Sequence, residues 1–370
     1  MRPTYAEINL SAIARNIRQI KNRVAPAQVM AVVKADGYGH GAIEAAKVAL
    51  ENGASYLGVA LVEEGIELRE NGIKSPILVF GGVFEDQVKS FFDYNLEMTV
   101  YQKDIIEKLS KWCLHYQKPM SVHVKVDTGM GRVGVSPQKA IAFIESLHKT
   151  KGVILRGVYT HFATADEKDK QYAYLQLEQF KSIISQLENK GIHIPIKHTA
   201  NSGAILDLPE SYFDMVRPGV MMYGYYPSAE TTQSIVIEPA MTLKTKVLFI
   251  KEIPAQTSVS YGRKFISDCT TRIATLPVGY ADGYNRLLTN KGMATIRGKK
   301  FPIVGRVCMD LIHVELGDDD EIQIGDEAIL FGQAKNNAFT VEEICQLIDT
   351  IPYEVTCWIS KRVPRIYIKN

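Results

Sequence analysis

The chain has 370 residues, 46% of them hydrophobic, and its 43 basic side chains nearly balance 41 acidic ones to give a formal net charge of +2. This length and hydrophobic content suit two well-packed domains, and the interspersed charges form no basic face of the kind that nucleic-acid binding requires. The longest apolar runs, such as Ile77 to Phe80, are far too short to cross a bilayer.

The cysteines and the first residues of the chain indicate the cellular compartment in which the protein is expected. The five cysteines are odd in number and include no Cys-x-x-Cys pair, which argues against a disulfide framework and against a structural zinc. Residues 1–7 contain no apolar signal core. We therefore expect a cytoplasmic protein without a bound metal.

The first predicted strand of the main pattern, Val29 to Lys34, ends on an amine and is followed by three glycines within residues 37–41. Desolvation lowers the pKa of a lysine and so yields the neutral amine that Schiff-base chemistry needs. Glycines permit positive φ and close backbone approach, so an anionic ligand can settle beside Tyr38. The alternative for Lys34 is a solvated surface lysine.

Short β-branched runs alternate with stretches of helical periodicity, such as Ala42 to Leu50 and Tyr172 to Leu187. Eight strands are predicted in this part: Val29 to Lys34, Tyr56 to Ala60, Pro76 to Phe80, Leu96 to Val100, Ser121 to Val126, Ile154 to Thr160, Ile194 to Thr199 and Phe213 to Arg217. Repeated βα units predict a (β/α)8 barrel, with a doubly wound open sheet as the alternative. The barrel is favoured because several reactive side chains fall at strand C-terminal ends, where barrel enzymes keep their chemistry. They are Lys34, Arg132, His161, Ser202 and Arg217.

From about Glu238 the sequence pattern changes to an alternation of apolar and polar residues with a period of two, as in Met241 to Leu248. Few long helical stretches occur before Val341 to Ile348. This pattern predicts a separate, mainly β domain. We place the boundary in the polar stretch 227–234, which gives a barrel over residues 1–232 and a second domain over residues 233–370.

Seven motifs in one order resemble bacterial alanine racemase and cover nearly the whole chain. They are Val33 to Gly41, Lys125 to Arg132, Thr160 to Ala163, His198 to Ser202, Val216 to Gly219, Ser260 to Gly262 and Arg306 to Asp310. The resemblance implies a pyridoxal phosphate enzyme in which Lys34 holds the cofactor as an aldimine. It also implies that residues Pro3 to Asn9 pair with the second domain.

The cofactor phosphate is expected at the loops after the seventh and eighth strands, beside a helix that opens at Asn201 and Ser202. Read alone, Ser202 is better explained as a simple N-cap of that helix. In this position it can also serve the phosphate, together with the backbone of Gly219 and Val220. Two tyrosines, Tyr38 and Tyr353, resemble the phosphate-binding tyrosines of the family.

By resemblance, Arg217 faces the pyridine nitrogen and His161 lies against the cofactor ring. A guanidinium cannot give up a proton, so it leaves that nitrogen uncharged and weakens the electron sink, which favours proton return over transamination. The alternatives are an ion pair of Arg217 with Asp214 and a satisfied core histidine at position 161.

Racemisation needs a base on each face of the planar carbanion, and Lys34 covers one face. The family assigns the other face to Tyr261, delivered from the partner subunit of a homodimer, although a tyrosine in such a segment is usually a packing residue. Arg132 and the backbone of Met309 are expected to hold the substrate carboxylate. Lys125 aligns with a lysine that many family members carry as a carbamate.

The sequence thus predicts a two-base alanine racemase that supplies D-alanine for peptidoglycan synthesis. The alternatives are a racemase of another small amino acid, a basic amino-acid decarboxylase, and a noncatalytic cofactor-binding barrel. Arg217 disfavours the decarboxylase, where a carboxylate is expected, and the second domain with Tyr261 disfavours the noncatalytic barrel.

Overall fold

The computed structural model describes residues 2–333 and 338–369, and the chain divides into two compact units. One unit comprises residues 13–37 and 42–238 and is called the barrel unit below. The other comprises residues 1–12, 38–41 and 239–370 and is called the β unit. Among the described residues, no helix combines the length and the apolar character that a membrane span requires.

The barrel unit contains eight parallel strands whose neighbours follow chain order around the sheet, with the last strand beside the first. They are β2 (Gln28–Val32), β3 (Tyr56–Val59), β4 (Ile77–Val79), β5 (Glu97–Val100), β6 (Met120–Lys125), β7 (Val153–Tyr159), β8 (Ile196–His198) and β9 (Met215–Val216). Backbone bonds from Asp214 N to Lys197 O and from Arg217 N to Ala200 O join β9 to β8 and nearly close the ring. The predicted (β/α)8 barrel is confirmed, and the open sheet is wrong because no strand reverses the order.

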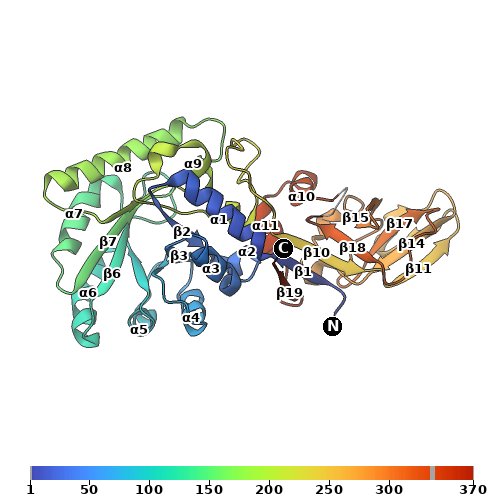
Figure 1. Cartoon of the computed structure of the whole chain (residues 1–370), viewed down its shortest axis with the longest axis horizontal. Helices are drawn as coiled ribbons and strands as arrows, with labels where there is room; N and C mark the ends of the chain where they lie inside the picture. The colour runs from blue at the N-terminus through green and yellow to red at the C-terminus, as the bar shows by residue number, and fades with distance from the viewer. Residues whose placement is uncertain (1, 334–337, 370) are drawn as a thin grey trace. The chain divides into compact units, whose positions relative to one another are not determined.

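Helices surround the strands of the barrel unit (Figure 1). They are α1 (Leu10–Val24), α3 (Ala42–Glu51), α4 (Val62–Glu70), α5 (Val88–Asp93), α6 (Lys103–Tyr116), α7 (Pro137–His148), α8 (Gln171–Asn189) and α9 (Ser202–Asp207), whereas the segment labelled α2 (Lys34–Tyr38) is a left-handed turn. In α8, Ala173, Leu177, Phe180 and Ile184 recur at three- and four-residue steps and are buried. This stripe is what packs a helix onto a barrel wall.

The barrel interior is filled by side chains from many strands. One cluster joins Met30, Tyr56, Leu78, Tyr159, Ile196 and Met215, with Phe80 packed against it. None of the six buried members exposes more than 5% of its surface. The interior is therefore a packed core, and chemistry is confined to the barrel ends.

The β unit has a six-stranded sheet in the order β16-β15-β18-β10-β1-β19 and a three-stranded sheet in the order β11-β14-β17. Its strands are β1 (Tyr5–Asn9), β10 (Met241–Lys246), β11 (Phe249–Ile253), β12 (Ser258–Val259), β13 (Phe265–Ile266), β14 (Thr271–Leu276), β15 (Met293–Ile296), β16 (Lys299–Pro302), β17 (Ile312–Gly317), β18 (Glu327–Phe331) and β19 (Arg365–Ile368). The α-helices among the residues of this unit that the structure describes are α10 (Val341–Ile348) and α11 (Pro352–Cys357). Strand β1 pairs antiparallel with β10 and parallel with β19, so it lies inside the larger sheet.

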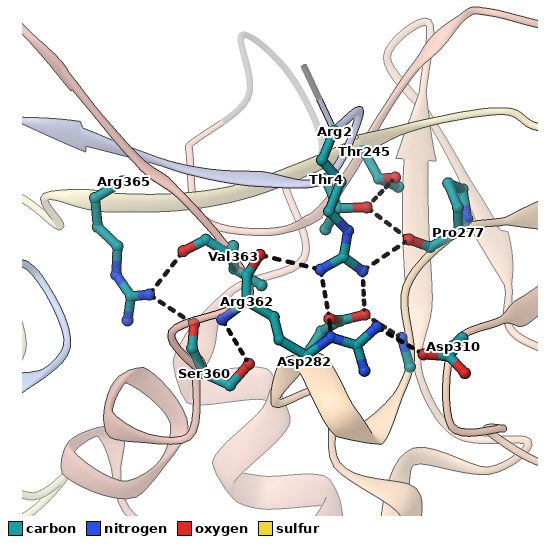
Figure 2. A network of polar contacts seen from close by, with 11 residues as sticks. Arg2, Thr4, Thr245, Pro277, Asp282, Asp310, Ser360, Arg362, Val363 and Arg365 are labelled. Atoms are coloured by element: carbon teal, nitrogen blue, oxygen red, sulfur yellow. Dashed lines mark hydrogen bonds and ion pairs between the residues drawn. The ribbon is translucent and has the colours of Figure 1, made fainter.

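A fully buried carboxylate, Asp282, organises polar contacts inside the β unit (Figure 2). Arg2 donates to both of its oxygens at 2.6 Å, and Arg362 lies 3.4 Å away. Arg362 also pairs with Asp310 at 2.7 Å. The network therefore joins the first residues to the segment that carries Met309, the neighbour of Asp310.

Candidate active site

The chain leaves β2 at Val32 and turns through a left-handed segment that begins directly after Lys34. Residues 35–38 have φ between 51° and 61°, although only Gly37 among them is a glycine. The left-handed backbones at Ala35, Asp36 and Tyr38 are costly for L-residues and persist only where the surroundings impose them. Lys34 itself lies two residues beyond the end of β2 and is half-buried.

Glu64 on α4 is the side chain that braces this turn. Its Oε1 accepts from Ala35 N at 2.6 Å, while its Oε2 accepts from Ala60 N at 2.7 Å and from Leu61 N at 3.1 Å. Asp36 adds a bond from Ala42 N at 3.0 Å. One carboxylate thus joins the turn after Lys34 to the turn after β3.

The carboxyl ends of the strands bring together side chains that are far apart in the sequence. Burial lowers the pKa of His161 well below its ordinary value, so this ring is neutral at neutral pH. Four cations lie close enough to lower that pKa further: Arg217, Arg132, Lys125 and Lys34. The barrel mouth is therefore strongly electropositive and suited to an anionic ligand.

Lys125, the last residue of β6, is buried within this cluster. Burial, followed by the charges of Arg132 and Arg217, lowers its pKa to about 8, and Asp127 opposes the shift. Asp127 also accepts from the backbone N–H groups of Gly129 and Gly131, and so shapes the loop that carries Arg132. A reactive neutral amine is thus accessible at Lys125 near neutral pH.

Arg217 is buried, with only 4% of its surface exposed, and it does not pair with Asp214 as the alternative interpretation expected. Its Nη1 donates to His198 Nδ1 at 3.0 Å and to His198 O at 2.7 Å. Its Nη2 donates to Thr160 O at 2.7 Å and to Thr199 O at 3.0 Å. Among the described residues, no acceptor meets its Nε–H, which is the one N–H left for a ligand.

The helix start at α9 corrects the simple N-cap interpretation of Ser202. Asn201 is the cap, because its Oδ1 accepts from Ala204 N at 3.0 Å. Ser202 Oγ instead accepts from Gly219 N at 3.0 Å and thereby joins the loop after β8 to the loop after β9. Val220 follows Gly219 and begins a buried 3-10 turn.

Two tyrosines expected at the phosphate lie together within the β unit. Tyr38 and Tyr353 have ring centroids 5.9 Å apart and an interplanar angle of 51°. Tyr353 lies on α11, a short helix that begins at Pro352. Tyr38 is the last residue of the left-handed segment 35–38.

Tyr261 and Met309 belong to neighbouring segments of the β unit and are both exposed, by 72% and 52%. Ser260, directly before Tyr261, donates from Oγ to Arg306 O at 2.7 Å and has φ of 67°. The backbone N–H of Ala281 donates to Met309 O at 3.1 Å. The unit thus presents both side chains on a braced surface.

Sequence reasoning missed Glu64 and His123, and it gave no role to His198, which opens one of the seven motifs. The two buried histidines, His123 and His198, connect to Arg217. His123 sits among valines in β6 and reads as an ordinary strand residue, and the only signal was one polar side chain in an apolar run. Within residues 2–333 and 338–369, no group of three or more His, Cys, Asp or Glu side chains forms a possible metal site.

Comparison with known proteins gives a consistent result. Residues 8–227 match the family model of the alanine racemase N-terminal domain, and residues 240–367 match that of the C-terminal domain. Alanine racemase 2 of Caldanaerobacter subterraneus subsp. tengcongensis is 46% identical over 100% of this chain and 95% of its own length.

Solved structures agree with these matches. The alanine racemase of Clostridium difficile is 41% identical with a TM-score of 0.95, covering 100% of this chain and 97% of that one. A histidine racemase from Leuconostoc mesenteroides is 26% identical with a TM-score of 0.92, covering 100% of this chain and 98% of that one. Since the two domain models match most of the chain and the relatives align along its whole length, this chain belongs to the alanine racemase family.

Proposed function

We propose that this chain interconverts L-alanine and D-alanine with pyridoxal phosphate held at the barrel mouth. The observation that carries the proposal is the cluster of four cations around a neutral His161, one of which is the amine of Lys34 just beyond β2. Such a site attracts the phosphate of the cofactor and the carboxylate of the amino-acid substrate. The proposed role is supply of D-alanine for peptidoglycan synthesis in the cytoplasm, and all five cysteines are free thiols, as a reducing compartment requires.

The residues present fit pyridoxal phosphate at three points. The Nε–H of Arg217 is a donor suited to the lone pair of an unprotonated pyridine nitrogen. The hydroxyl of Ser202 accepts from Gly219 and so keeps its own hydrogen for an anion. Lys34 provides the amine. When bound, pyridoxal phosphate supplies an aldehyde that condenses with amines and a ring that withdraws electrons from the α-carbon.

Phosphate binding is assigned to the hydroxyl of Ser202, the backbone N–H of Val220 and the hydroxyls of Tyr38 and Tyr353, with Gly219 holding the Ser202 hydroxyl in place through its backbone N–H. Asn201 supports them by capping α9. Hydroxyls and backbone N–H groups bind the phosphate without adding positive charge to the barrel mouth. Because the phosphate is an anion, its binding lowers the repulsion among the cations there. His161 is assigned to the face of the cofactor ring, where a neutral imidazole packs without adding charge.

Lys34 and Tyr261 are proposed as the two bases. Lys34 Nζ removes or returns the proton on the D face, and Tyr261 Oη serves the L face. The exposure of Tyr261 and Met309 supports a homodimer in which each β unit completes the partner's barrel site. Arg132 and the backbone of Met309 are assigned to the substrate carboxylate, which holds the α-proton between the bases.

Lys125 is proposed to carry a carbamate formed from carbon dioxide. A neutral amine is the reactive form, and a pKa of about 8 makes that form accessible. The modification replaces a cation with an anion beside Arg132, which removes one repulsion and orients the guanidinium.

The decisive experiment measures racemisation of L- and D-alanine by purified protein with added pyridoxal phosphate, using chiral chromatography. Serine and histidine are assayed in parallel, because a histidine racemase has the same fold. Conversion of histidine but not alanine would refute the proposed substrate. Borohydride reduction and peptide mapping should label Lys34, with Lys47→Ala as a matched control that retains the label.

A mixed-subunit experiment tests the shared site. The Lys34→Ala and Tyr261→Phe homodimers should both be inactive, whereas a heterodimer regains one complete site, with Lys34 from one subunit and Tyr261 from the other. A verified heterodimer without activity would show that Tyr261 does not act across subunits.

A further inference from the structure

A line of buried hydrogen bonds runs from Arg217 through the barrel interior to Glu97, the first residue of β5. His198 Nδ1 lies 3.0 Å from Arg217 Nη1, and His198 Nε2 lies 2.9 Å from His123 Nδ1. His123 Nε2 lies 2.9 Å from Glu97 Oε2. We call these four residues the barrel relay. Since β5 is parallel to the other strands, Glu97 lies at the end opposite the mouth.

The positions of the hydrogens in the relay follow from the guanidinium of Arg217, which cannot accept a hydrogen bond. A guanidinium only donates, so His198 Nδ1 must be the acceptor and His198 Nε2 carries the hydrogen. His123 Nδ1 then accepts, and His123 Nε2 donates to the carboxylate of Glu97. Burial lowers the pKa of His198 well below its ordinary value, in keeping with a neutral ring. Each ring therefore has one permitted tautomer.

The barrel makes room for this line of side chains. A Cβ at Gly157 would lie 2.4 Å from His123 Nδ1, so only glycine fits beside the ring. The register of β6 and β7 shifts between Val122 and His123, at the same level. Tyr159 stacks on His198 with centroids 4.7 Å apart.

Glu97, at the end of the relay, also accepts a hydrogen bond from a residue outside the relay. Tyr56 donates its hydroxyl to the same Oε2 of Glu97. Burial and the charge of Glu97 raise the pKa of Tyr56, so it remains a donor. Glu97 is therefore an acceptor for both neighbours, which completes a single direction of donation from Arg217 to Glu97.

We propose that Glu97 is a positioning residue for racemisation, acting through His123 and His198 to fix the guanidinium of Arg217. With His198 locked as an acceptor, Nη1 is committed to the relay and Nε–H is left for the ligand ring. Arg217 contacts no carboxylate among the described residues, so Glu97 is also the anion at the end of its hydrogen-bond line. The inference rests on the proposed function only for the identity of that ring.

The first test reads the tautomers directly in the purified holoenzyme. Protein labelled with ¹⁵N-histidine is studied by long-range ¹H–¹⁵N correlation, with assignments from His123→Gln and His198→Gln. Both rings should be neutral with hydrogen on Nε2. Hydrogen on Nδ1 of His198, or a cationic ring, would overturn the proposal without any appeal to activity.

The second test compares three variants. Glu97→Met removes the acceptor and should lower kcat about 10- to 100-fold, as loss of a supporting partner of a site residue commonly does, with KM nearly unchanged. Its His123 and His198 signals should show mixed tautomers. Glu97→Gln offers an amide oxygen to His123 and should restore both kcat and the tautomers. Tyr56→Phe keeps the relay and should retain activity.

Two outcomes would contradict the relay. Unchanged kcat in Glu97→Met would show that Arg217 does not depend on Glu97. Equal losses in Glu97→Gln and Tyr56→Phe would point to general damage of the core. If Glu97→Met folds poorly, the wild-type NMR spectra and the activity of Glu97→Gln still test the relay. Both predicted tautomers in a protein without racemase activity would refute the proposed function and leave the support of Arg217 by Glu97 in place.

Discussion

Replacing Glu64 with glutamine should weaken catalysis, because this carboxylate imposes the left-handed turn after Lys34. Ala35, Asp36 and Tyr38 are L-residues with positive φ, and at about 1–2 kcal/mol each the turn costs roughly 3–6 kcal/mol. Of the three bonds to Glu64, only the one from Ala35 N reaches this turn, and one bond to a half-exposed carboxylate offsets about 2 kcal/mol of the cost.

A glutamine has one carbonyl oxygen, so it keeps the bonds from Ala60 and Leu61 and presents its amide N–H₂ to Ala35. Loss of that one bond should cost about 2 kcal/mol. This corresponds to a fall of roughly 30-fold in kcat/KM if the turn must form for Lys34 to act. Steady-state racemisation of L-alanine measures the fall, and cofactor absorbance measures weaker retention of pyridoxal phosphate.

The control and the suppressor lie in the same region. Glu67→Gln changes a carboxylate on the same helix whose side chain makes no hydrogen bond with the described residues, so it should behave as wild type. Ala35→Gly removes about 1–2 kcal/mol of left-handed cost and should recover about tenfold of the activity in Glu64→Gln. Wild-type kcat/KM in Glu64→Gln, or no recovery in the double variant, would refute the account of the turn.

Three further outcomes are expected. The pKa values of His161 and His198 are lowered in the folded state, so the unfolded chain binds more protons than the folded chain below about pH 6.5. The free energy of unfolding should therefore decrease as the pH is lowered below this value, by about 1.4 kcal/mol per pH unit for each ring. Chemical denaturation at several pH values measures it, and a free energy that does not change with pH would contradict this. If Lys125 is a carbamate, ¹³C-bicarbonate should give a carbamate NMR signal that Lys125→Ala lacks, and activity should fall when bicarbonate is removed. Tyr261→Phe should lose α-hydrogen exchange with solvent on L-alanine far more than on D-alanine, whereas equal loss on both would argue against one base for each face.

The sequence predicted the barrel because β-branched runs and helical stripes are local signals. Each of the eight predicted strands overlaps an observed one, and the helix predicted at Val341 to Ile348 has those bounds. The left-handed turn was not predictable, because Ala35 and Asp36 have no intrinsic preference for it and a carboxylate from α4 imposes it. His123 was missed for a similar reason, since its partners come from two other strands.

Within the site, side-chain identity was easier to predict than side-chain partners. The position of Ser202 at a helix start was right, but the cap is its neighbour Asn201. The preference of Ser202 for Gly219 depends on how close the loops after β8 and β9 lie, which only the closed ring determines. Arg217 was expected to face the pyridine nitrogen, and its five bonds to backbone carbonyls and to the rings of His198 and His161 form only in the folded barrel.

The placement of β1 between β10 and β19 has a consequence for synthesis on the ribosome. Strand β1 ends at Asn9, and β10 begins about 230 residues later, at Met241. At translation rates of about 5–20 residues per second, β1 waits roughly 10–50 seconds for its first partner. Only Ala6 and Ile8 of this strand are buried in the finished sheet, so the waiting segment exposes little apolar surface. A fragment that starts at residue 239 lacks this inner strand, so the β unit cannot be completed from its own continuous stretch of chain.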